Sequence, residues 1–149
     1  MTTLIANSLK IFIPGKPEPQ GSVKGFPIRR KTGAMGVAMT CDNVKLKGWR
    51  GRAVAIIQKS SEGAFCGAVC VSAEFIMPRP AGAAKTAKGK ELGWHITKPD
   101  TDKLVRAVGD ALTASGIITD DSQIAQWGAM KRYAGIGEDP GTLIEVTRL

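Results

Sequence analysis

The pattern that decides the fold of this chain lies in residues 98–123, KPDTDKLVRAVGDALTASGIITDDSQ. Apolar residues recur here at helical spacing, so we expect a helix over about residues 101–115 that Gly116 ends in the left-handed conformation. The apolar stripe of this helix consists of Leu104, Val105, Val108, Ala111 and Leu112. The opposite face carries Asp102, Arg106 and Asp110. Their spacing of four residues is also typical of an ordinary salt-bridge ladder on a solvated helix.

The sequence on either side of this helix predicts a mixed sheet. Period-two alternation or apolar runs predict strands at residues 9–13, 35–41, 69–77, 124–133 and 142–148. A further helix is expected from Asp42, as its N-cap, to about Ser60. No periodicity is found from Pro14 to Gly33 or from Pro78 to Lys98, so we predict long loops there. The order of strands and helices predicts an α/β (α+β) fold in which a mixed sheet packs with two main helices.

The size and composition of the chain limit its class. A chain of 149 residues fits one domain, here taken as residues 1–149. No apolar run approaches the ~18 residues of a membrane span, and the first residues lack the pattern of a signal peptide. Cys41, Cys66, Cys70 and His95 have the spacing of no familiar zinc module, and free cysteines are usually buried as small hydrophobes. We therefore expect a cytoplasmic protein with no membrane contact.

The charge of the chain is unevenly distributed. Its net charge is +8, and residues 1–60 contain eleven Lys and Arg against two acidic residues. Residues 99–149 contain five basic against eight acidic residues. The basic part predicts a polyanionic partner, most often nucleic acid, although a basic protein can also be merely soluble. The candidate DNA-binding residues are Lys16, Lys24, Arg29, Arg30, Lys31, Lys98 and Lys103.

The acidic residues around the helix at 101–115 suggest a different role. Asp100 and Asp102 can converge only if Asp100 precedes the helix and Asp102 lies in its first turn. One carboxylate would suffice to cap the helix, whereas Asp120 and Asp121 follow just after it. Carboxylates this close repel one another unless a cation neutralises them, and hard oxygen ligands suit Mg²⁺ or Mn²⁺ rather than zinc. Capping and metal binding both remain open on spacing alone.

An acidic cluster that holds Mg²⁺ beside a basic surface suggests phosphodiester cleavage. A bound metal activates water and stabilises the leaving oxygen. Arg106 lies one turn after Asp102, where its positive charge could stabilise the pentacovalent phosphate.

The same residues resemble the RusA family of Holliday junction resolvases, which is common in phages. The resemblance lies in Lys98–Leu104, Asp110–Thr113 and Asp120–Gln123, and residues 15–22 also look like the opening of many phage members. It implies a mixed α/β fold and a homodimer that depends on Mg²⁺, with Mn²⁺ as a substitute. It also implies that two opposed strands of a four-way DNA junction are cut.

The resemblance also implies roles for single residues. The three metal-binding aspartates of the family fall on Asp100, Asp102 and Asp121, with Asp120 as a possible helper. The catalytic lysine of the family falls on Arg106. This departure keeps the positive charge, but arginine is effectively always protonated and cannot donate a proton as lysine can.

Two rival functions use the same residues differently. The first is a nuclease for other branched or flapped DNA, with the same metal chemistry. The second is a basic DNA-binding protein without catalysis, in which the acidic residues are structural. Cleavage of a junction, a flap and a linear duplex, each with and without Mg²⁺, separates them.

Overall fold

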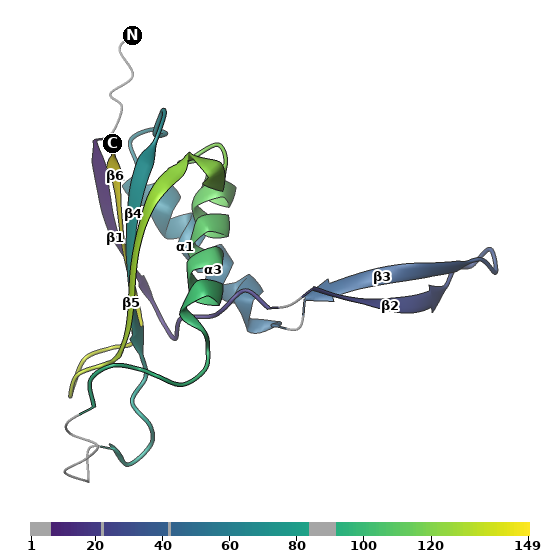
Figure 1. The fold of residues 1–149 in the computed structure, drawn as a ribbon, viewed down its shortest axis with the longest axis horizontal. Coiled ribbons are helices and arrows are strands. Elements are labelled where there is room, and N and C mark those ends of the chain that lie inside the picture. Colours follow the sequence, from purple (N-terminus) through teal and green to yellow (C-terminus); the bar gives the residue numbers. More distant parts are fainter. Residues whose placement is uncertain (1–6, 22, 42, 84–91) are drawn as a thin grey trace.

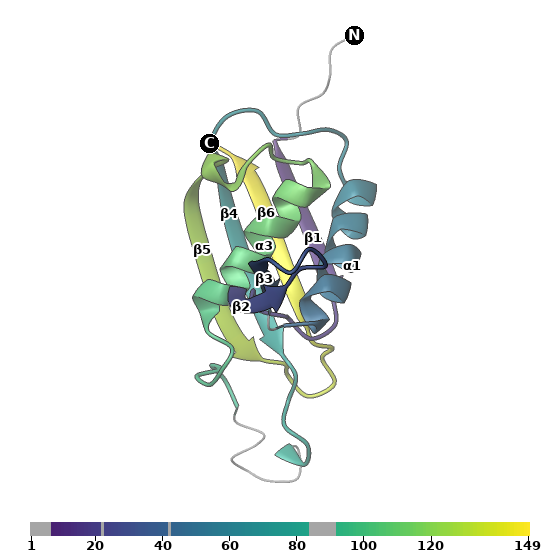
Figure 2. The same ribbon diagram turned by 90° about the vertical axis from the view of Figure 1, so that its right-hand side faces the viewer.

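The computed structural model describes residues 7–21, 23–41, 43–83 and 92–149. Along the chain its elements are β1 (Ser8–Pro14), β2 (Val23–Arg29), β3 (Met35–Cys41), α1 (Lys45–Ser60), β4 (Val69–Met77), α3 (Thr101–Ser115), the short 3-10 helix η2 (Asp121–Gln123), β5 (Ile124–Tyr133) and β6 (Gly141–Arg148). Strands β1, β6, β4 and β5 form a sheet, and α1 and α3 cover one of its faces (Figures 1 and 2). The predicted mixed sheet with two main helices is thus confirmed.

The order of strands in the sheet is β1-β6-β4-β5. β6 pairs antiparallel with both β1 and β4, whereas β5 pairs parallel with β4. Parallel neighbours need a crossover connection, and here α3 provides it between β4 and β5. The crossover places the start of α3 beside the edge strand β5, where Lys131 binds Pro99 O, and packs Trp127 of β5 on Gly109 in the middle of the helix.

The core lies between the sheet and the two helices. β1 buries Leu9, Ile11 and Ile13 and exposes the residues between them, as the alternation in the sequence predicts. The predicted stripe of α3 is buried except Val105, which is half-buried. The residues that α1 buries against it are Leu46, Trp49, Ala53 and Ile57. Because these side chains pack α1 and α3 onto the same face, the first turns of the two helices have fixed positions relative to each other.

The prediction of a loop from Pro14 to Gly33 is wrong. Residues 23–29 form β2, which pairs with β3 as an antiparallel hairpin that projects away from the sheet (Figure 1). Gly33, at φ +83°, allows the turn, and the Arg30 N–H donates to Ala34 O across it at 2.9 Å. The described side chains of residues 25–29 are all exposed, so no buried face imposes polar–apolar alternation on this part of β2. The strand results from its pairing with β3.

The start of α1 also differs from the prediction. The helix begins at Lys45 with Val44 at its N-cap, while Asp42 lies outside the described residues. The side chain of Asn43 supplies a nearby acceptor, because its Oδ1 takes a hydrogen bond from the Lys45 N–H at 3.1 Å.

The segment before α3 is partly ordered by β5. Within the predicted loop, Tyr133 N–H donates to Gly93 O at 2.9 Å and His95 N–H donates to Lys131 O at 3.1 Å. His95 is buried, with its ring centroid 4.7 Å from that of Tyr133, whereas Trp94 is exposed. Burial, and next the nearby Lys131, lower the pKa of His95. His95 is therefore a packing residue, and of this pair only Trp94 is available to a ligand.

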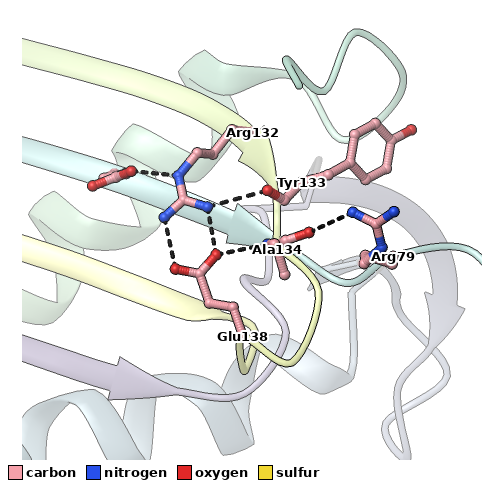
Figure 3. A network of polar contacts seen from close by, with 7 residues as sticks. Arg79, Arg132, Tyr133, Ala134 and Glu138 are labelled. Atoms are coloured by element: carbon pink, nitrogen blue, oxygen red, sulfur yellow. Dashed lines mark hydrogen bonds and ion pairs between the residues drawn. The ribbon is translucent and has the colours of Figure 1, made fainter. Parts of the chain in front are cut away.

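Arg132 and Arg79 form a network of hydrogen bonds at the end of β5 (Figure 3). Arg132 binds Glu74 on β4 and both carboxylate oxygens of Glu138 in the loop before β6. Arg79 Nη1 donates to Ala134 O at 3.1 Å beside it. The hydrogen bonds from Arg132, and next from the Gly135 N–H, lower the pKa of Glu138 to about 2. The network ties β4, β5 and the turn into β6 together at the end of β5 that adjoins Lys131.

Candidate active site

Asp100 and Asp102 have the placement that their convergence requires. Asp100 occupies the N-cap position of α3 in extended conformation, and Asp102 lies in the first turn. The Asp100 side chain makes no capping hydrogen bond, and Lys103 Nζ lies 4.0 Å from its Oδ2. Both aspartates are exposed. Capping therefore does not use the Asp100 carboxylate, which remains available to a ligand.

Asp120 and Asp121 lie after α3, where Asp120 is the N-cap and Asp121 the first residue of η2. Asp120 caps this short helix, because its Oδ1 accepts a hydrogen bond from the Ser122 N–H at 2.8 Å. That bond lowers the pKa of Asp120. The pKa of Asp121 is raised, first by its hydrogen bond with the Asp120 carboxyl and then by burial and by repulsion from Asp120 and Asp110. Asp120 thus has a structural role, whereas Asp121 lies in a field of like charges.

Gly109 allows η2 to lie against the middle of α3. A β-carbon at Gly109 would lie 3.7 Å from Asp121 Cβ and 3.7 Å from Trp127 Cζ2, so both residues pack on this point of the helix. Asp121 is accordingly next to Asp110, the following residue of α3. The fold therefore brings the two acidic segments of the sequence to the same helix, one at its start and the other at its middle.

The predicted salt-bridge ladder along α3 is not formed. Asp110 Oδ2 pairs with Arg50 Nη2 of α1 at 3.4 Å. Arg106 is exposed and has no ion pair or hydrogen bond with the described side chains. Arg50 was not indicated by the sequence, because 60 residues separate it from Asp110. Among the described residues nothing pairs with the guanidinium of Arg106, so it is available to an anion.

The segment between β1 and β2 is fastened to the start of α3. The Gln20 N–H donates to Lys103 O at 3.0 Å, and Arg50 Nη2 donates to Gln20 Oε1 at 2.8 Å. Asn43 Nδ2 donates to Pro19 O at 2.8 Å from the other root of the hairpin. Both roots of the β2–β3 hairpin are therefore held beside Asp100.

A cleft of about 390 Å³ opens at Asp100. Three of the predicted DNA-binding residues, Lys16, Lys98 and Lys103, line it together with Asp100. Arg29, Arg30 and Lys31 lie instead at the far end of the hairpin (Figure 1), and the Lys24 side chain lies outside the described part of the chain. The structure thus divides the predicted basic residues into a set at the cleft and a set at the hairpin tip.

Lys131 positions the residues that lead into Asp100. Its Nζ donates to Thr97 O at 2.6 Å and to Pro99 O at 2.5 Å. The Lys98–Pro99 peptide bond between these acceptors is cis. This role could not be predicted from the sequence, since Lys131 lies on β5, more than 30 residues away.

The carboxylates have the right chemistry for a hard divalent cation. Within the described ranges, however, no three acidic, histidine or cysteine side chains are gathered closely enough to form a complete metal site. The side chains at 100 and 102 are exposed. The pKa of Asp121 is raised, first by its hydrogen bond with the Asp120 carboxyl, then by burial and by repulsion from Asp120 and Asp110, and a bound cation would relieve that repulsion. In donor type the residues therefore fit Mg²⁺, with Asp100, Asp102 and Asp121 as the available carboxylates.

A protein family matches this chain over nearly its whole length. No curated protein matches the chain. A family model described as endodeoxyribonuclease RusA matches residues 14–147, which include the cleft, both helices and every strand of the sheet except most of β1. No helix in the described part of the chain is long and apolar enough to cross a membrane. Since the match covers nearly the whole chain and the carboxylates at both acidic segments, the chain belongs to the RusA family of endodeoxyribonucleases.

Proposed function

We propose that this chain is a Mg²⁺-dependent endonuclease that resolves four-way DNA junctions, with residues 1–149 as one catalytic domain. RusA family membership implies a Holliday-junction-resolving endonuclease. The observation that carries the proposal is the exposed carboxylate of Asp100, which makes no capping bond and lines a cleft together with three lysines and Glu18. A cleft that combines two carboxylates with three lysines suits a site that binds both a cation and a phosphate.

Asp100, Asp102 and Asp121 would hold the cation in this proposal, and Mn²⁺ would substitute for Mg²⁺. When bound, the metal supplies an activated water and stabilises the leaving oxygen of the phosphodiester. Lys16, Lys98 and Lys103 would hold the DNA backbone in the cleft. Arg106 is free of ion pairs with the described residues, so its charge is available to the phosphate as negative charge develops there.

The proposed resolvase is a homodimer. One chain has one set of these carboxylates, so two opposed cuts in one binding event need two chains. A twofold dimer presents two identical sites to a junction that has approximate twofold symmetry. The basic hairpin tips, doubled by the axis, would widen the positive surface that meets the DNA.

Cleavage assays on three matched substrates test this function. A four-way junction, a flap and a linear duplex of the same sequence are each incubated with Mg²⁺ and with EDTA. We expect symmetric cuts in the junction alone, and only with Mg²⁺. Preferred cutting of the flap would favour the branched-DNA nuclease instead. Tight binding without cleavage of any substrate would favour the non-catalytic DNA-binding protein.

A further inference from the structure

The hairpin of β2 and β3, which we term the arm (residues 23–41), exposes apolar side chains that nothing in the described chain covers. Met35 is 70% exposed, Val37 65% and Met39 64%, although all three belong to a strand. Phe26, on β2, is 46% exposed. A two-stranded hairpin alone in water is marginally stable at best, so side chains of this kind are expected to have a partner.

The pairing register gathers three of these side chains into one strip. Gly25, Pro27 and Arg29 lie opposite Met39, Val37 and Met35 on the same face of the arm. A β-carbon at Gly25 would lie 3.0 Å from Val37 Cγ1 and 3.1 Å from Met39 Sδ, so these two side chains lie over the glycine backbone. The result is a continuous apolar strip of Met39, Val37 and Met35 that ends at the basic tip.

The charge of the arm fits a polyanion. Residues 19–41 contain no Asp or Glu, whereas the tip carries Arg29, Arg30 and Lys31 in succession. Two arms brought together by a dimer axis would repel each other at these tips. Nucleic acid offers phosphates to the tip and flat apolar base surfaces to the strip, which an acidic protein surface does not.

The position of the arm connects it with the proposed active site. Its first root is bound to α3 through the Gln20 N–H and Lys103 O, and its second through Asn43 to Pro19 O. A strand of seven residues spans ~23 Å, which exceeds the ~8 Å depth of a DNA groove. DNA held at Asp100 therefore lies within reach of the strip, and the arm is long enough to extend past one groove.

We propose that the arm enters the open centre of branched DNA, where its tip holds phosphates and the strip of Met35, Val37 and Met39 contacts unstacked bases. This inference rests on the proposed junction-cutting function. Apolar side chains such as Met, Phe and Ile are known to insert between base steps and unstack them. Unstacking costs least where bases are already poorly stacked, as at a branch point. A two-stranded ribbon is also narrow enough for the ~12 Å major groove that leads to it.

A fluorescent base placed beside the branch point tests the proposal without catalysis. The probe is a synthetic four-way junction with 2-aminopurine at its centre, bound by the full chain in EDTA. Two triple variants are compared, one with Ser and one with Leu at positions 35, 37 and 39. We expect the wild type and the Leu variant to raise the fluorescence equally. The fluorescence increase of the Ser variant should be at most one fifth of the wild-type increase, while its affinity for linear duplex stays within twofold of the wild-type affinity.

Controls separate the arm from the fold and from the nuclease. Ile136→Ser removes an equally exposed apolar side chain, 67% exposed in the β5–β6 loop, and should leave the signal unchanged. Equal circular dichroism and melting temperature show that the Ser variant is folded. The proposal is overturned if the wild type gives no increase, if the Ser variant retains it, or if the Ser variant instead converts a dimer into monomers. A wild-type increase without Mg²⁺-dependent cleavage would overturn the nuclease function and leave the arm proposal standing.

Discussion

Replacement of Arg106 is the sharpest test of the proposed chemistry, because the structure excludes the alternative role of this residue in a salt-bridge ladder along α3. If Arg106 only linked Asp102 and Asp110, the loss of an exposed pair would cost about 0.3–0.5 kcal/mol, or about twofold in any equilibrium. The ladder is not formed, and Arg106 has no ion pair with the described residues. Arg and Ala also have similar helix propensities, so Arg106→Ala should leave the folded state nearly unchanged.

A catalytic role predicts a much larger effect on the rate. We expect Arg106→Ala to slow single-turnover junction cleavage by more than tenfold, which is about 1.4 kcal/mol in the barrier. Arg106→Lys should stay close to wild type, since it keeps the charge and restores the residue that is typical of the family. Lys59→Ala, a loss of one charge in the last turn of α1, is the matched control. An Arg106→Ala rate within twofold of wild type, at equal melting temperature, would refute the catalytic reasoning.

Four further outcomes are expected. Asp121→Asn should abolish cleavage and leave junction binding in EDTA intact or tighter, because affinity comes mainly from Lys and Arg on phosphates. Gel shifts and cleavage assays on one preparation measure binding and rate, and a cleavage rate near that of wild type would falsify the metal role. Lys131→Met removes two hydrogen bonds to Thr97 O and Pro99 O and should lower stability by about 1–2 kcal/mol, or about 3–6 °C in melting temperature; an unchanged melting curve contradicts this. The pKa of Glu138 is lowered to about 2, so the stability that it contributes is complete above its ordinary pKa near 4.5 and is lost as the pH falls from there towards 2. The melting temperature of Glu138→Gln should therefore fall less steeply with pH than that of wild type across this range. Equal slopes for the two proteins would contradict the linkage. Finally, sedimentation should show a dimer, and a cruciform plasmid should yield linear product at early times, whereas a monomer that gives only nicked circles would contradict the paired-cut model.

The acidic residues show how much of the candidate active site could be predicted from the sequence. The placement of Asp100 before α3 and of Asp102 in its first turn followed from the helical pattern, which predicts a helix over about residues 101–115, and the structure confirms it. The partner of Asp110 could not be predicted, because Arg50 is brought to it only when α1 and α3 pack on the same face of the sheet. The same holds for Lys131, whose hydrogen bonds to the segment before Asp100 depend on the neighbouring edge strand. Capping by Asp120 depends on η2, a helix too short to produce a periodic signal.

Local patterns were sufficient to predict the strands of the main sheet, both helices and the family, because residues that bury one face repeat with the period of their element and because the family motif is local. Tertiary structure alone decided the β2 strand, whose two exposed faces leave no pattern in residues 23–29. It also decided that the basic residues form two separate sets, one at the cleft and one at the arm tip. Composition counts charges along the chain, whereas their separation in space depends on a hairpin that extends away from the core and on roots that are bound beside α3.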